Sequence, residues 1–130
     1  MLVPFPIACF VGTLLSDLAY WRTGNVMWTN FSSWLLTAGL VMGGLAALAG
    51  LIDFLGSPRV RSRGPAWPHM LGNILALLLS LVNVFVHSRD GWTSVVPTGL
   101  ILSAVVVLIL LVTGWLGWSL VYRHRVGVAQ

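Results

Sequence analysis

The sequence contains no lysine and no glutamate, so its charge comes from seven arginines and three aspartates. Charged residues make up 8% of the 130 positions, whereas hydrophobic residues make up 58%. A soluble domain carries about 25% charged residues. This shortage of charge excludes an ordinary soluble domain and predicts a chain embedded in a lipid bilayer.

Cysteine is nearly absent too, because Cys9 is the only one. A single cysteine excludes an intrachain disulfide and a metal cluster built from cysteines. The sequence also lacks a glycine-rich phosphate loop, an HExxH zinc motif and a serine nucleophile in a recognisable turn. These absences favour an electron-transfer or structural subunit over a stand-alone enzyme.

Four long apolar runs divide the chain. A run of about 17 to 25 residues crosses the hydrocarbon core as a helix, whereas an open strand would leave its backbone groups unpaired in lipid. Nothing basic precedes the first run and no cleavage pattern follows it, so we expect no removable signal peptide. We predict an all-α membrane protein, a single four-span domain over residues 1–130, with a four-helix bundle of helices at about 3–20, 33–55, 68–87 and 95–122.

The arginines predict the orientation of this bundle. With four spans, the N-terminus, the loop at residues 56–68 and the C-terminal tail share one side of the membrane. That side holds Arg59, Arg61, Arg63, Arg123 and Arg125, and the other side holds Arg22 and Arg89. Arginine in short loops marks the cytoplasm, so we expect both termini there. The net charge of +4 fits anionic lipid headgroups and does not predict a nucleic-acid partner.

Polar residues recur along one stripe of the third predicted helix. At about 100° per residue, all of them fall within about 40° of His69 on a helical wheel. The stripe consists of His69, Asn73, Ser80, Asn83 and His87. The rest of the circumference is aliphatic, so we expect the stripe to face the bundle interior.

The other helices each show one face of small or polar residues as well. On the second helix this face ends in a carboxylate and comprises Gly39, Gly43, Ala46, Gly50 and Asp53. On the first helix Cys9, Thr13, Ser16 and Tyr20 align beside Asp17, and on the fourth Thr113, Gly117 and His124 align. Helix backbones approach closely along such faces.

These faces predict two polar clusters, about 27 Å apart along the third helix. The cluster on the cytoplasmic side gathers His69, Asn73, Asp53 and His124. The outer cluster gathers Asp17, Tyr20, Asn83 and His87. A proton path between them is not expected, because the middle of the third helix offers only Ser80.

Two histidines at one depth on different helices suggest a haem site. His69 and His124 are candidate axial ligands of a b-type haem, with Gly72 and Gly117 leaving room for the macrocycle. Asp53 and Asn73 would orient the two imidazoles. The alternative is that both histidines cap helix ends or bond to Asp53. His87 is expected to be an interfacial histidine, unless a second copy of the chain supplies a partner.

Four segments in the same order resemble a bacterial family of membrane proteins, domain of unknown function 2231. They read "LVPFPIA", "GLAALAGLIDFL", "HMLGNILALLL" and "GWLGWSLVYRHRVGV". The resemblance covers nearly the whole chain and implies a multi-pass protein of the bacterial inner membrane. Its motifs designate Asp53, His69, Asn73, Tyr122 and His124, whereas Pro4 stands where the family often has a histidine.

The resemblance also implies a redox setting, because similar domains occur joined to Rieske domains or encoded beside quinoprotein dehydrogenases. Two functions follow from the sequence. One is a redox-associated subunit that binds haem b and exchanges electrons with quinone. The other is a cofactor-free accessory subunit that anchors or stabilises a larger respiratory or photosynthetic complex. Expected partners are the lipid bilayer and either other membrane subunits or a second copy of the chain.

Overall fold

The computed structural model describes residues 3–89 and 95–125, and within these ranges all regular structure is helical. This confirms the predicted all-α class. The elements in chain order are α1 (Pro4–Thr23), α2 (Val26–Gly56), α3 (Pro58–Arg61), α4 (Ala66–His87), η1 (Val95–Gly99) and α6 (Leu100–Tyr122). η1 is a short kinked entry to α6, in which Val96 has extended backbone angles.

Three helical segments are long and apolar enough to cross a membrane. They are Val26–Gly56, Ala66–His87 and Val95–Tyr122. α1 has 20 residues, about 30 Å of helix, but it is less apolar and carries Asp17. That α1 is a fourth span stays a prediction.

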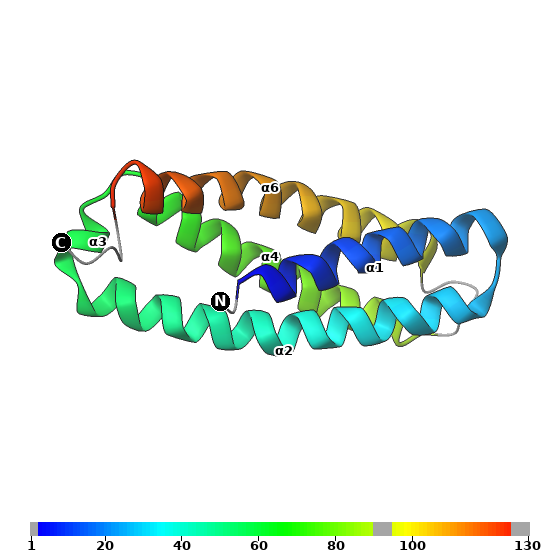
Figure 1. Cartoon of the computed structure of the whole chain (residues 1–130). Helices are drawn as coiled ribbons and strands as arrows, with labels where there is room; N and C mark the ends of the chain where they lie inside the picture. The colour runs from blue at the N-terminus through cyan, green and yellow to red at the C-terminus, as the bar shows by residue number, and fades with distance from the viewer. Residues whose placement is uncertain (1–2, 90–94, 126–130) are drawn as a thin grey trace.

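The four long helices lie side by side and nearly along one direction (Figure 1). α1 and α4 each pack against both α2 and α6. Each helix contributes to one apolar core, whose buried members are Phe10, Leu36, Ala76, Val106 and Leu110. The outward surface is also apolar, since Ile52, Phe85 and Leu111 are each about two-thirds exposed. An apolar surface of this extent suits contact with lipid.

α2 begins seven residues before its predicted start at residue 33. Gly24 takes a left-handed conformation with φ 65° that ends α1, and the Asn25 side chain accepts a hydrogen bond from the Met27 N–H at 3.0 Å. The polar hydroxyls that follow are satisfied within the helix, because they bond to carbonyls of the preceding turn. Thr29 donates to the Val26 carbonyl at 2.7 Å, and Ser33 donates to the Thr29 carbonyl at 2.9 Å.

α1 covers only part of α2. At 1.5 Å per residue, the 31 residues of α2 span about 46 Å, so α2 extends well beyond the start of α1. Figure 1 shows the start of α1 beside the middle of α2. We call the end formed by α3, the start of α4 and the end of α6 the arginine-rich end, and the opposite end the Asp17 end.

The predicted inward face of α2 is therefore correct over only half its length. Gly39 and Gly43 are buried, whereas Gly50 and Asp53 are exposed. Beyond the start of α1, no helix in the described part of the chain covers Gly50 and Asp53 on that face. Phe54 is buried there instead, in a second apolar cluster with Ala66 and Leu120.

Candidate functional site

A buried carboxyl group forms the centre of the Asp17 end. Asp17 on α1 has no exposed surface. Its Oδ1 accepts a hydrogen bond from Ser32 Oγ of α2 at 2.6 Å and lies 2.9 Å from His87 Nε2 of α4. Its Oδ2 accepts from Ser103 Oγ of α6 at 2.6 Å. One side chain thus joins all four long helices.

Asn83 completes this network on α4. Its Nδ2 donates to Ser103 Oγ at 2.9 Å. His87 Nδ1 lies 3.0 Å from the Asn83 backbone carbonyl and 3.1 Å from Asn83 Oδ1. Since oxygens of this kind only accept hydrogen bonds, Nδ1 carries a hydrogen. The buried polar groups of Asp17, Asn83, His87 and Ser103 all have partners, as burial requires.

The predicted outer cluster forms, and Tyr20 is also buried on α1. The prediction of His87 as an interfacial histidine is wrong, because its side chain is 1% exposed and pairs with Asp17 of the same chain. Sequence analysis missed Ser32 and Ser103. The position of Ser32 could have been predicted, because Ser32 lies at helical spacing before Leu36 and Gly39, on the inward face of α2.

Ser80 lies one turn from Asn83 on the same stripe of α4. It is completely buried, and its hydroxyl has no hydrogen-bond partner among the residues that the structure describes. The predicted inward position of the polar stripe of α4 is confirmed, because Ser80, Asn83 and His87 are buried and His69 and Asn73 are half-buried.

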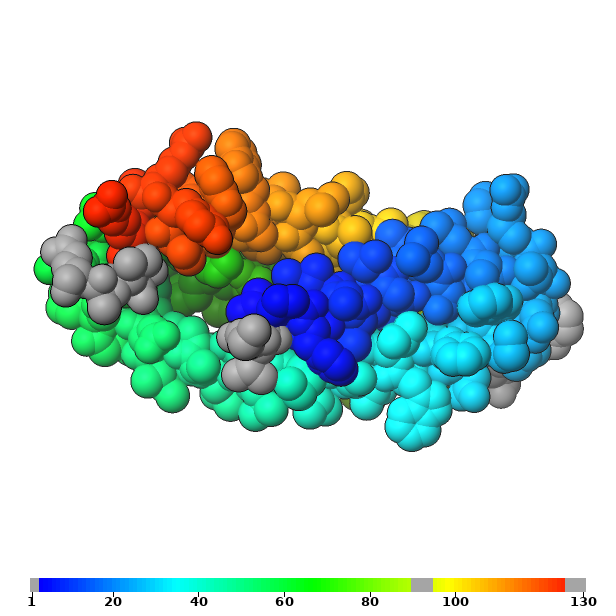
Figure 2. Space-filling model, in the orientation of Figure 1, coloured from blue at the N-terminus to red at the C-terminus, as the bar shows by residue number. Residues whose placement is uncertain are grey.

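A cavity of about 720 Å³ lies between the start of α1 and the arginine-rich end. Figure 2 shows the surface hollowed beside the start of α1. Most lining residues are apolar and come from α1, α2, α4 and α6, including Phe10, Leu40 and Leu77, and the polar lining residues are His69, Asn73 and Thr113. Its size and apolar character are those of a site for a small molecule or cofactor.

His69 is held at the wall of this cavity by a backbone acceptor. Its Nδ1 lies 2.8 Å from the Thr113 carbonyl of α6, so Nδ1 carries the ring hydrogen. In the neutral imidazole Nε2 then carries no hydrogen and has a lone pair that can bind a metal. A histidine whose other nitrogen donates to a carbonyl is the usual arrangement for a metal ligand.

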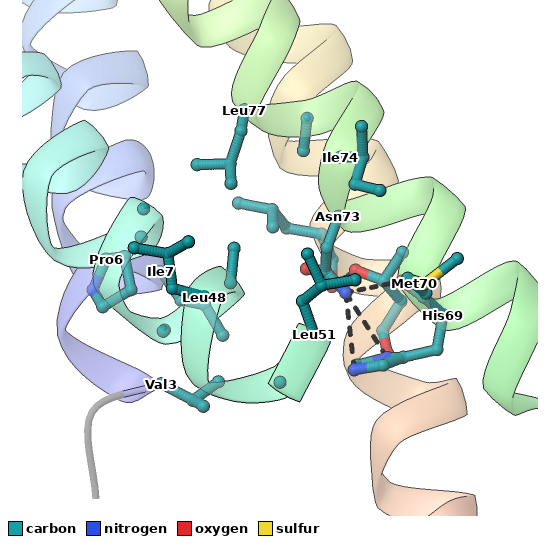
Figure 3. Close-up of a pocket in the computed structure, with 18 of the residues that line it drawn as sticks. Val3, Pro6, Ile7, Leu48, Leu51, His69, Met70, Asn73, Ile74 and Leu77 are labelled. Carbon is teal, nitrogen blue, oxygen red and sulfur yellow. Dashed lines mark hydrogen bonds between the residues drawn. The ribbon is translucent and has the colours of Figure 1, made fainter. Parts of the chain in front are cut away.

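Asn73 lies against the ring of His69 (Figure 3). Its Nδ2 donates to the His69 backbone carbonyl at 2.7 Å and is 3.4 Å from both Nδ1 and Nε2. A group equally far from both nitrogens at this distance lies over the ring face, because in the ring plane it would collide with Cε1. The in-plane lone pair of Nε2 is therefore not occupied by Asn73.

The two glycines expected to make room for a macrocycle have another role. A Cβ at Gly72 would collide with the side chain of Thr113, and a Cβ at Gly117 would lie 2.8 Å from Cε1 of His69. Both glycines let α4 and α6 approach closely. The space for a ligand lies instead beside the start of α1, where α2 extends beyond that helix.

The other predicted members of this cluster lie apart from the cavity wall. His124 follows α6, is half-buried and is not among the lining residues. The exposed Asp53 carboxylate makes no hydrogen bond to any residue in the described ranges, and Tyr122 is 69% exposed with its ring 5.4 Å from Trp118. Within residues 3–89 and 95–125 no three metal-binding side chains gather.

Over residues 1–130 the sequence matches the family of predicted membrane proteins called domain of unknown function 2231, so the chain belongs to that family. This confirms the resemblance seen in the sequence. No curated protein and no solved structure matches the chain.

Proposed function

We propose that the chain is a small redox-associated membrane subunit that holds a b-type haem in the cavity, with His69 Nε2 as an axial ligand. The geometry of His69 carries this proposal: Nδ1 is fixed on the Thr113 carbonyl at 2.8 Å, and the Nε2 lone pair is left free beside the cavity. A haem held there would supply one-electron redox chemistry. Through it the chain would exchange electrons with quinone in the bacterial inner membrane.

The surroundings of His69 support this role. Thr113 fixes the tautomer, Asn73 covers one ring face, and the absence of a side chain at Gly117 lets the imidazole lie close against α6. A ring restrained on three sides keeps its orientation when a ligand binds, which favours metal coordination.

His124 is the second axial ligand that the sequence suggests. His124 comes seven residues after Gly117, which lies against the ring of His69. Seven helical residues rise about 10.5 Å. His124 does not line the cavity. The proposal therefore rests on His69, and His124 is tested in the same experiment.

The test is the absorption spectrum of dithionite-reduced protein, purified after expression with ample haem. We expect a b-type Soret band and α-band in the wild type and their loss in His69→Ala. His124→Ala should shift the bands if His124 binds iron. Asp53→Asn, on the exposed part of α2, serves as the matched control and should keep the wild-type haem content. A colourless, folded wild type would refute haem binding.

A cofactor-free accessory subunit is the second candidate. The network around Asp17 supports it, because one buried carboxyl group cross-links four helices and stabilises the bundle without any ligand. Such a subunit would anchor a larger membrane complex or pair with a second copy. The spectrum separates the two candidates, since only the first gives a haem signal that His69→Ala removes.

A further inference from the structure

We propose that the cavity beside the start of α1 holds one acyl chain of an anionic phospholipid when no haem is bound there. The lipid headgroup lies on Arg59, Arg61 and Arg63, which follow α2 in the chain. The surrounding bilayer supplies this lipid. Its binding concerns the haem-free chain, so it does not depend on either function proposed above.

The shape of the cavity fits a single hydrocarbon chain. Its lining runs along α2 from Leu40 to Phe54, a rise of about 21 Å. A volume of about 720 Å³ over that length gives a mean cross-section of about 34 Å². An α-helix about 10 Å across needs about 80 Å². The cavity is therefore too narrow for a partner helix but is long enough to take an acyl chain.

The polarity of the lining changes with depth in the same order as the parts of a phospholipid. Trp67 and Tyr122 are exposed at the arginine-rich end, and such aromatic residues mark the level of the lipid headgroups. His69 and Asn73 lie about 3 and 9 Å further along α4, at the level of the ester groups. Beyond Asn73 the wall is apolar, as at Leu77 (Figure 3). A lipid aligned with the helices thus meets groups of matching polarity.

The headgroup end of the cavity is basic. Val60 of α3 lines the cavity, and in the sequence it lies between Arg59 and Arg61, with Arg63 one turn further on. Arg61 Nη1 donates a hydrogen bond to a carbonyl at the end of α2 at 2.6 Å, which holds α3 in this position. Between positions 50 and 70 the sequence has one acid, Asp53, against these three arginines. Such a charge favours anionic headgroups over zwitterionic ones.

The experiment measures the lipid bound per chain by native mass spectrometry of haem-free protein in a nonionic detergent. The probes are phosphatidylglycerol and phosphatidylcholine with identical acyl chains. We expect one retained phosphatidylglycerol per chain, bound about tenfold or more tighter than phosphatidylcholine. Equal retention of the two lipids would overturn the role of the arginines, and retention of neither would overturn the site.

Point variants separate the acyl chain from the headgroup. Gly50 lines the cavity, and a Cβ there would have no atom within 4 Å. Gly50→Leu should therefore fill the cavity and abolish retention of both lipids. Gly56→Leu is the matched control, because Gly56 has equally open space but does not line the cavity. Wild-type retention in Gly50→Leu would show that the acyl chain does not lie in the cavity.

Replacing the arginines tests the headgroup contact. Arg59→Gln and Arg63→Gln should each weaken phosphatidylglycerol binding about fivefold and leave phosphatidylcholine binding unchanged. An equal loss for both lipids would contradict a charge contact with the headgroup.

A second measurement needs only the wild-type chain, in case Gly50→Leu does not fold. Phosphatidylglycerol with a photoreactive diazirine at the end of one acyl chain should label cavity residues near the start of α1, such as Ile7 and Leu40. Labelling confined to outward-facing residues, such as Phe85 and Leu111, would place the lipid outside the cavity and overturn the proposal.

These outcomes are distinguishable from those of the haem test. A chain that retains phosphatidylglycerol but stays colourless with ample haem refutes haem binding alone. A chain that binds haem but retains no lipid in its haem-free form refutes lipid binding alone. Haem added to the lipid-loaded chain should release the lipid, because both ligands occupy the same cavity.

Discussion

Single residues at the Asp17 end differ mainly in whether their polar atoms are satisfied. Ser103 and Ser80 are both buried serines on helices that pack together. Ser103 accepts from Asn83 and donates to Asp17, whereas the hydroxyl of Ser80 has no partner within the described ranges 3–89 and 95–125. Removing a bonded hydroxyl leaves buried groups unsatisfied, but removing an unbonded one leaves none.

We therefore expect Ser103→Ala to destabilise the protein by about 1–3 kcal/mol, because it leaves Asp17 Oδ2 and Asn83 Nδ2 without partners. Ser80→Ala is the matched control and should be neutral or stabilising. Thermal unfolding in detergent measures both. Equal losses in the two variants would show that the Asp17 network does not stabilise the bundle.

The inward position of a side chain could be predicted where exposing that side chain to lipid would cost much free energy. Asp17 and Asn83 stand out in apolar runs because lipid cannot solvate them, so their inward position followed from the sequence, whereas the burial of His87 did not. Serine gives a weaker signal, because the position of Ser32 on the inward face of α2 does not identify its partner. Ser33 bonds to its own helix, whereas Ser32 reaches Asp17, and the folded packing was needed to show that contact. Asp53 was misplaced because the wheel does not show where α1 begins.

Helix packing depends on where small residues meet other helices. Gly39 and Gly44 both lie on α2, but a Cβ at Gly39 would lie 2.9 Å from Cε1 of Phe10 and 3.1 Å from Cβ of Cys9. A Cβ at Gly44 would have no atom within 4 Å. The positions of the long helices followed from the apolar runs except for the early start of α2, whereas the partner of each glycine required the three-dimensional arrangement.

Gly39→Ala should therefore push α1 away from α2 and cost about 1–3 kcal/mol of stability. Gly44→Ala gains helix propensity without a collision and should be neutral or slightly stabilising. Chemical unfolding in detergent compares the two. If Gly44→Ala is as damaging as Gly39→Ala, the α1–α2 contact is not as close as the structure shows.

At the scale of the whole molecule, charge and length define two ends. α3 and the loop before α4 carry Arg59, Arg61 and Arg63, and the Asp17 end carries Arg22 and Arg89. Arg61 bonds to the Leu55 carbonyl at 2.6 Å, which holds the basic segment against the end of α2. This asymmetry predicts that the arginine-rich end faces the cytoplasm.

α1 decides whether the chain has three or four spans. It carries a buried aspartate, but that aspartate pairs with His87 and accepts from two serines, so its burial in the membrane is compensated. α1 also packs along α2 and α6, both of which contain segments able to span a membrane. A helix of about 30 Å in that position is long enough to cross the hydrocarbon core. We therefore expect four spans, with both termini on the arginine-rich side.

Reporters at three places test this topology. A reporter at Gly64 should be cytoplasmic and one near Asn25 periplasmic, because α2 separates them. A tag before Met1, which lies outside the described residues, isolates α1. If α1 crosses the membrane, the tag lies on the Gly64 side, and if it does not, the tag lies on the Asn25 side. A fusion after Gln130, also outside the described residues, should match Gly64 and serves as the control. A periplasmic signal at Gly64 would reverse the orientation and place the His69 cavity toward the outside.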